Sequence, residues 1–246
     1  MAFEPQNQLE RSLMQAIGDP AWRPQFYRDF AASEIFTFLG GEPSTAADGV
    51  GPRPDQDISL TLFTNGERSF VPIFSSPSRL QAMAREGDRF IGVSALTLCR
   101  MVGGNDVFLN PGSPCSKEFT ASEVAAIADG SIWESDTIQV DRPTPFQIGV
   151  PADYPVEFAE SLKRLFAQKE EITRAWLALV RFHDTGESET RIGIEATHEV
   201  PGITAEIRMV AHASPVPNLP VTVMQVGPGG VPAGTFTRIP PFYERT

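Results

Sequence analysis

The chain has few of the residues on which familiar enzyme and metal sites depend. Its 246 residues include two cysteines, too few for a disulfide framework, and its three histidines all lie after residue 182. There is no glycine-rich phosphate loop ending in Lys-Ser or Lys-Thr, no nucleophile elbow, no His-Glu-x-x-His and no Cys-x-x-Cys. These absences favour a binding role over catalysis, and we expect no catalytic residues, no metal site and no cofactor.

Basic residues and long apolar runs are also scarce. The chain has 31 acidic and 20 basic residues, which gives a net charge of −11. A chain with this charge repels polyanions, so nucleic acid is not an expected partner. No run of 18 apolar residues and no basic-then-apolar N-terminus is present. The sequence therefore predicts a cytoplasmic protein with no signal peptide, no membrane span and no membrane partner.

Two features look like parts of a chemical site but have plainer explanations. Asp184-Thr185-Gly186 matches the tripeptide of aspartic proteases, yet that mechanism needs two carboxylates, and the tripeptide occurs once, where a hairpin turn is expected. His183 and His198 are expected at opposite ends of the same hairpin, which separates them too far to share a zinc ion.

The most distinctive segment of the chain joins a short strand to a helix. An apolar strand at 107–109 is followed by the loop Asn110-Pro111-Gly112-Ser113-Pro114. Thr120 and Glu123 then form a capping box, in which each side chain bonds the backbone N–H of the other residue. Gly130 ends the helix. A helix start of this kind fixes the loop that precedes it.

That loop has two alternative roles. As a connection, Asn110 would bond its own backbone and Gly112 would adopt a positive φ. As a binding site, the free N–H groups and the Ser113 hydroxyl would face a cleft shared with the second domain, like an anion-binding nest. In the second case Asn110, Gly112 and Ser113 are binding residues.

Cys115 follows this loop and leaves a thiol enzyme as an alternative. Nearby Lys117 and the helix N-terminus would favour a thiolate, and the loop would serve as an oxyanion site. However, no histidine precedes residue 183 to act as a base, so Cys115 is otherwise an incidental exposed thiol. Cys99 is expected to be a buried small hydrophobic residue in a helix at 94–101.

Apolar periodicity predicts the elements of the first half. Helices are expected near 9–17, 26–30, 77–84 and 94–101, and strands at 35–39, 58–64, 68–74, 90–93 and 107–109. Asn65-Gly66 predicts a hairpin turn between the second and third of these strands. The segment 40–57, rich in glycine, proline and aspartate, is expected to be a long loop.

The pattern restarts after the proline-bearing segment 132–145. A strand at 146–150 and a helix near 158–166 precede a hairpin formed by 172–182 and 191–197, and a helix at 203–211 and a strand at 220–226 follow. This βαββαβ order is that of the split-βαβ or ferredoxin-like arrangement. We therefore expect an α+β protein of two mixed α/β domains, residues 1–138 and 139–246, the second a ferredoxin-like sandwich.

Several short segments resemble the enhanced serine sensitivity protein SseB family. They are 7–16, 70–80, 108–113, 118–123 and the terminal Pro241-Phe242-Tyr243-Glu244-Arg245. Cys115 departs from the family pattern. The resemblance implies an SseB-like N-terminal and an SseB-like C-terminal domain, and it brings no catalytic residues.

The C-terminal aromatics complete the set of candidate binding residues. Phe242 and Tyr243 are expected either to dock on the sheet of the second domain or to engage the first domain or a partner. The sequence thus favours a non-enzymatic regulatory or adaptor protein that binds protein partners. A sensor of a small polar metabolite such as an amino acid is the alternative, because ferredoxin-like domains often bind metabolites and the family name invokes serine.

Overall fold

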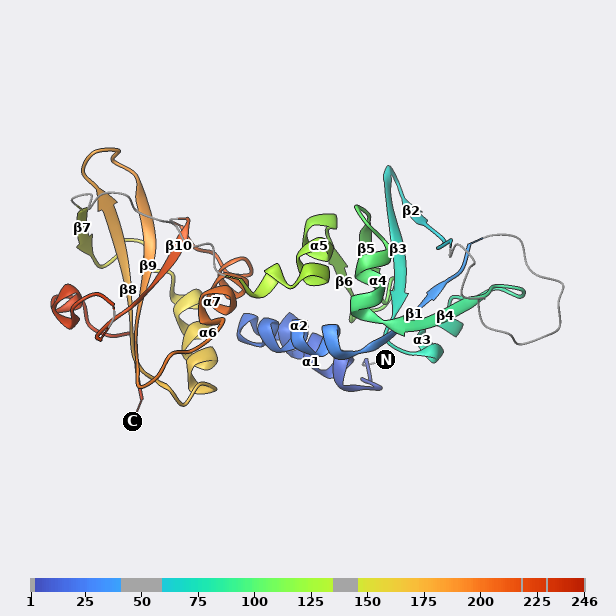
Figure 1. Cartoon of the computed structure of the whole chain (residues 1–246), viewed down its shortest axis with the longest axis horizontal. Helices are drawn as coiled ribbons and strands as arrows, with labels where there is room; N and C mark the ends of the chain where they lie inside the picture. The colour runs from blue at the N-terminus through green and yellow to red at the C-terminus, as the bar shows by residue number, and fades with distance from the viewer. Residues whose placement is uncertain (1–2, 41–58, 135–145, 218, 229, 246) are drawn as a thin grey trace. The chain divides into compact units, whose positions relative to one another are not determined.

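The computed structural model describes residues 3–40, 59–134, 146–217, 219–228 and 230–245 (Figure 1). The chain divides into two compact units. Met1–Gly18 and Gln25–Ile132 form the first, and Asp19–Pro24 and Trp133–Thr246 form the second. The predicted domain boundary at 138/139 and most of the predicted loop 40–57 lie outside the described residues. The described part contains seven α-helices and two mixed sheets, so the protein is α+β.

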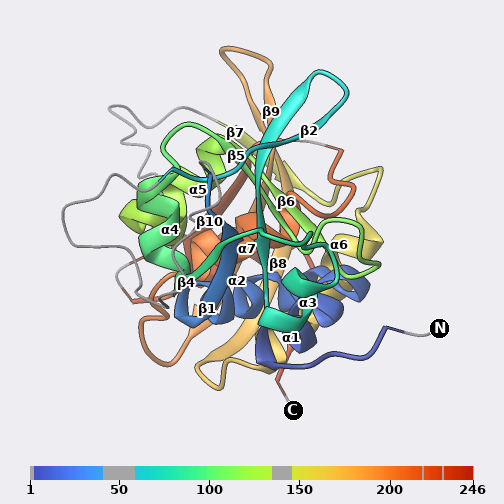
Figure 2. The same ribbon diagram turned by 90° about the vertical axis from the view of Figure 1, so that its right-hand side faces the viewer.

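The first unit is built on a sheet with strand order β4-β1-β3-β5-β6, in which β2 also pairs with β3. Among the described strands of this sheet, only β3 and β5 are parallel neighbours. The bounds are β1 Glu34–Phe38, β2 Phe63–Asn65, β3 Arg68–Phe74, β4 Phe90–Ser94, β5 Asp106–Leu109 and β6 Lys117–Phe119. The predicted hairpin is confirmed, with Gly66 at φ 64°, although its first strand is shorter than expected. The hairpin projects from the sheet in Figures 1 and 2.

The helices of the first unit begin where the sequence provides caps. The Ser76 and Ser94 side chains accept hydrogen bonds from the N–H groups of the residues three positions later. The capping box of Thr120 is present, and Gly130 ends its helix with φ 86°. The bounds are α1 Gln8–Gly18, α2 Arg23–Ala32, α3 Pro77–Gln81, α4 Ala95–Met101 and α5 Ala121–Asp129, with a 3₁₀ turn η2 at Ser131–Trp133. The predicted capping box and the predicted helices are therefore confirmed, except that α3 ends at Gln81 and does not extend to residue 84 as predicted.

Strand alternation gives the first sheet an inner and an outer face. On the inner face, Phe119 of β6 stacks on Phe30 of α2 with ring centroids 4.7 Å apart. Both rings are fully buried, and each contributes about 1.5–3 kcal/mol through its loss of contact with water. On the outer face, Leu80 of α3 covers Phe38 and Phe74. The rest of the outer face, towards β5 and β6, carries half-buried phenylalanines.

The second unit is built on a sheet with strand order β10-β9-β8-β11, in which β7 also pairs with β8. In the part of this sheet that the structure describes, only β9 and β10 are parallel neighbours. The bounds are β7 Phe146–Gly149, α6 Val156–Ala167, β8 Ile172–Phe182, β9 Ser188–Ala196, α7 Ile203–Ala211, β10 Val221–Gln225 and β11 Tyr243–Glu244, with 3₁₀ turns η1 at Pro20–Trp22 and η3 at Ala233–Phe236. The predicted order βαββαβ is confirmed.

The predicted ferredoxin-like arrangement is wrong. A split βαβ unit has parallel first and second strands with another strand between them. Here β7 and β8 are antiparallel neighbours, with Phe146 opposite Phe182. The long β8 pairs with β9 along one edge and shares its other edge between β7 and β11, where Tyr243 lies opposite Ala175. The order of elements along the chain does not determine this pairing, because hydrogen bonding between strands depends on tertiary contacts.

The second sheet is covered on both faces. Helices α6 and α7 pack on one face, in a core that includes Ala21 of η1. The segment after β10, red in Figure 1, packs on the other face, where Phe236 stacks on Trp176 at 5.5 Å. A Cβ atom at Gly193 would lie 2.6 Å from the Phe236 ring, so glycine is required for this close packing. No helix among the described residues is long and apolar enough to cross a membrane.

Candidate functional site

The loop after β5 joins two strands, whereas the sequence predicted that it leads straight to a helix. β6 follows the loop and pairs antiparallel with β5, with Glu118 opposite Phe108. The strand has only three residues, Lys-Glu-Phe, so it carries too little apolar alternation to be recognised in the sequence. The positive φ predicted for Gly112 is confirmed at 77°.

Asn110 holds this loop to the end of β3. Its side chain is 2% exposed and accepts a hydrogen bond from the Ser75 N–H at 3.0 Å. Its amide nitrogen bonds the Ser75 hydroxyl at 2.9 Å, and its own N–H donates to the Ile73 carbonyl at 2.8 Å. The expectation that Asn110 bonds its own backbone is therefore wrong, because the parallel pairing of β3 and β5 brings Ser75 within reach.

A buried carboxylate extends this polar cluster. Glu10 of α1 is 0% exposed and accepts hydrogen bonds from Arg79 Nε at 2.9 Å and Arg79 Nη2 at 3.0 Å. It also accepts from the Ser75 hydroxyl and from the Gln6 N–H. Burial alone would raise the pKa of Glu10, but these hydrogen bonds outweigh it and hold the pKa below its usual value. The cluster ties α1, α3 and the loop together.

Cys115 lies against this cluster and is not an exposed thiol. It is 2% exposed, and its Sγ is 3.8 Å from the Glu10 carbonyl oxygen. Burial and the Glu10 charge raise the pKa of Cys115 to about 11. Lys117 bonds Glu123 at 3.0 Å and does not pair with Cys115. Cys99 is 3% exposed, as predicted. The expectation of an exposed Cys115 is therefore wrong, and its thiol is poorly suited to act as a nucleophile.

The remaining loop candidates lie at the surface. The Ser113 hydroxyl is half-buried and accepts a hydrogen bond from the Cys115 N–H at 3.2 Å, which closes a local turn. Gly112 is exposed. The Asn110 side chain is therefore occupied by hydrogen bonds within the fold. Gly112 and Ser113 are accessible and remain candidates for contact with a partner.

The C-terminal aromatics dock on the second unit's sheet, which is one of the two positions predicted for them. Phe242 and Tyr243 lie 6.0 and 5.7 Å from the Phe166 ring of α6. The Arg245 guanidinium donates to the carbonyl oxygens of Ile172, Phe166 and Lys169. These contacts order the tail, and both aromatics remain half-buried.

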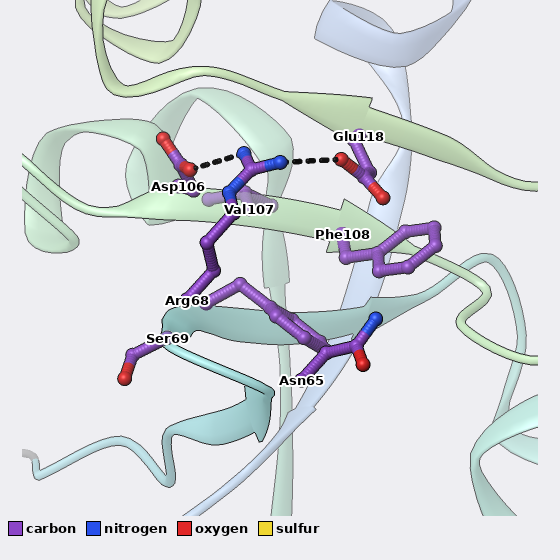
Figure 3. A pocket seen from close by; sticks show the side chains of 8 residues that line it. Asn65, Arg68, Ser69, Asp106, Val107, Phe108 and Glu118 are labelled. Atoms are coloured by element: carbon purple, nitrogen blue, oxygen red, sulfur yellow. Dashed lines mark hydrogen bonds and ion pairs between the residues drawn. The ribbon is translucent and has the colours of Figure 1, made fainter.

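The structure shows a pocket that the sequence did not reveal, on the open part of the first sheet's outer face (Figure 3). Arg68 of β3 reaches across to β5 and β6, where Nη2 lies 2.8 Å from Asp106 and Nη1 lies 3.4 Å from Glu118. Phe70 and Phe108 meet edge to face beside it, with ring centroids 5.2 Å apart. These residues share one face because Phe70 lies opposite Asp106 and Phe108 opposite Glu118.

The two carboxylates of this pocket are held differently. Asp106 also accepts a hydrogen bond from the Ala121 N–H at 2.9 Å, at the start of α5. Arg68 and this N–H lower the pKa of Asp106, so it remains ionised. Glu118 is 55% exposed, and its carboxylate has only the longer contact with Arg68 among the residues that the structure describes. The pocket thus has one fixed and one accessible carboxylate beside a guanidinium and two aromatic rings.

The tripeptide Asp184-Thr185-Gly186 forms the predicted hairpin turn. Gly186 has φ 70°, and the Asp184 carboxylate accepts a hydrogen bond from the Thr185 N–H at 2.9 Å. Among the described residues, no group of three or more His, Cys, Asp or Glu side chains is placed to hold a metal ion.

Two family models match the chain: the SseB protein N-terminal domain over residues 9–126 and the SseB protein C-terminal domain over residues 140–245. The chain belongs to the SseB family. It is 28% identical over 247 residues to Protein SseB of Escherichia coli (strain K12) and, at the same identity, to Protein SseB of Shigella flexneri. Each alignment covers 98% of this chain and 93% of the relative. No solved structure matches the chain.

The predicted family is therefore confirmed. The loop 110–114 and the pocket around Arg68 both lie within the N-terminal family domain, and the docked tail lies within the C-terminal one.

Proposed function

We propose that this protein is a non-enzymatic regulatory or adaptor protein that binds a partner protein through the outer face of its first sheet. The observation that carries the proposal is the pocket formed by Arg68, Phe70 and Phe108 on the open part of that face. Arginine and aromatic side chains are enriched at protein interfaces, where a few of them provide most of the binding energy. Here they lie together on neighbouring strands of one sheet.

The charges of the pocket indicate what the partner presents. Asp106 and Glu118 carry one more negative charge than Arg68 compensates, and the whole chain has a net charge of −11. A basic segment is therefore drawn to this face, whereas an acidic one is repelled. We expect the partner to place a lysine or arginine against Glu118 and an apolar side chain on the Phe70 and Phe108 rings.

The other functions suggested by the sequence have less support. A thiol enzyme needs an accessible thiolate, whereas Cys115 is buried with a pKa of about 11. The metabolite sensor depends on a ferredoxin-like arrangement, and the pairing of β7 with β8 differs from that arrangement.

The cysteines bear on the cellular location, because both are free. Free thiols are usual in reducing compartments, which supports our proposal of a cytoplasmic location.

The proposal is tested by matched charge reversals. Wild-type protein, Glu118→Lys and the control Glu187→Lys would be immobilised and exposed to extract from the source cell. Glu187 is exposed in the second unit, so its reversal changes the net charge equally and leaves the pocket intact. We expect a basic protein that binds wild type and the control, and binds Glu118→Lys at least about tenfold more weakly in a purified assay.

Phe108→Ser would provide a second variant, with its melting curve measured to establish folding. A partner that depends on both Glu118 and Phe108 locates the interface at the pocket. If all four proteins capture the same set with equal affinity, the outer face of the first sheet is not the interface.

A further inference from the structure

The second unit has a cavity on the sheet face that lies away from α6 and α7. Its volume is about 580 Å³, within the range of about 300–1,000 Å³ that is typical of small-molecule pockets. Strands β8 and β9 form one wall, and the C-terminal segment between η3 and β11 forms the other. None of its residues belongs to the pocket around Arg68, so it would be a separate site.

Half of the residues that line this cavity are apolar, and the aromatic pair among them is firmly held. Trp176 of β8 stacks on Phe236, with ring planes 22° apart, and Gly193 gives Phe236 the space for this contact. Pro240 and Pro241 also line the cavity and are exposed. Proline restricts the backbone, so little order has to be gained when a ligand binds there. A flat or aliphatic group therefore has a prepared surface.

The four charged side chains at the cavity, two arginines and two glutamates, have a net charge of zero, but they are not paired evenly. Arg174 lies between two carboxylates, with Nη1 3.8 Å from Glu195 and Nε 3.2 Å from Glu244, so its charge is compensated within the wall. Arg238 also lines the cavity and is exposed. It has no ion pair or hydrogen bond with any side chain in the described part of the chain.

We propose that this cavity binds a small organic monocarboxylate, with the carboxylate on Arg238 and the apolar body against Trp176 and the two prolines. The planar guanidinium matches a carboxylate through two parallel N–H···O bonds. Glu195 and Glu244 disfavour ligands with two or more negative charges, such as inorganic phosphate. The site therefore selects a singly charged acid with an apolar group.

Phenylacetate is a suitable probe, because it combines one carboxylate with one flat ring. Its binding to the full chain would be measured by ligand-observed NMR, with phenylacetamide as the neutral control of the same shape. We expect phenylacetate to bind wild type, and Arg238→Gln to weaken it at least about tenfold, as expected for the loss of a charge-assisted hydrogen bond. Arg181→Gln removes the same charge from an exposed site on β8 outside the cavity, and binding to it should equal that of wild type.

Two further measurements separate the proposed site from general attraction. Glu195→Gln should tighten phenylacetate binding, because it removes a repulsive charge and releases Arg174. Inorganic phosphate in excess should not displace the probe. The proposal is overturned if wild type fails to bind phenylacetate, if phenylacetamide binds equally well, or if Arg181→Gln weakens binding as much as Arg238→Gln does. Melting temperatures of all variants would confirm that each is folded.

Discussion

Glu10→Gln tests whether the buried polar cluster stabilises the first unit. The substitution keeps the size of the side chain, removes its charge and turns one acceptor oxygen into a donor. In the wild-type protein the two oxygens accept from Arg79, Ser75 and the Gln6 N–H. Whichever way the glutamine amide is turned, its NH₂ group faces at least one of these donors. The variant therefore loses hydrogen bonds and leaves the Arg79 charge without its partner.

The magnitude follows from the burial of the two partners. Hydrogen bonds to charged groups contribute about 1.5–3 kcal/mol each, and loss of one member of a buried ion pair costs about 3–5 kcal/mol. The Arg79 side chain is 25% exposed, so water stabilises the guanidinium that remains. We therefore expect Glu10→Gln to lower the free energy of unfolding by about 2–4 kcal/mol at pH 7.

Urea denaturation followed by circular dichroism measures this loss. The exposed Glu4 gives a matched control, since Glu4→Gln changes the charge equally and leaves the backbone carbonyl that accepts from Arg79. The control should stay within about 0.5 kcal/mol of wild type. A Glu10→Gln variant as stable as the control would refute the view that the cluster holds the unit together.

The pH dependence provides a second check with a defined sign. The pKa of Glu10 in the folded protein lies below its ordinary value of 4.5. A carboxyl with a lowered folded pKa adds stability that is fully present above the unfolded pKa and is lost as the pH falls. The stability difference between wild type and Glu10→Gln should therefore be largest near neutral pH and shrink below pH 4.5.

Three further predictions concern single contacts. Asn110→Ala removes the bonds to Ser75 and leaves that buried N–H unpaired, so urea denaturation should show a loss of about 1–3 kcal/mol. Gly193→Ala forces a Cβ against the Phe236 ring, and the same assay should show a loss of about 1–3 kcal/mol, whereas no change would mean that the ring moves freely. Native Cys115 should react with iodoacetamide far more slowly than it does in urea, and equal rates would contradict its burial and raised pKa.

The features predicted correctly from the sequence depend on residues close together in the chain. Thr120 and Glu123 form their capping box within one helical turn, and Asn65-Gly66 specifies a hairpin turn by its own backbone preferences. The features predicted incorrectly depend on distant partners. β6 exists because three residues pair with β5. β8 has β7 on part of one edge, and β11 occupies the rest of that edge because the C-terminal part of the chain returns there.

The difference between local and distant contacts also explains why the sequence indicated a site in the loop, whereas the structure shows a pocket on the sheet. Alternation indicates that Arg68 and Phe70 share a face, but it cannot indicate that Asp106, 38 residues later, lies beside Arg68. The β3–β5 register creates that contact and also brings Asn110 to Ser75. One register thus has two consequences. It buries Asn110 of the loop in hydrogen bonds with Ser75. It also places Arg68 and Phe70 beside Asp106 on the outer face of the sheet.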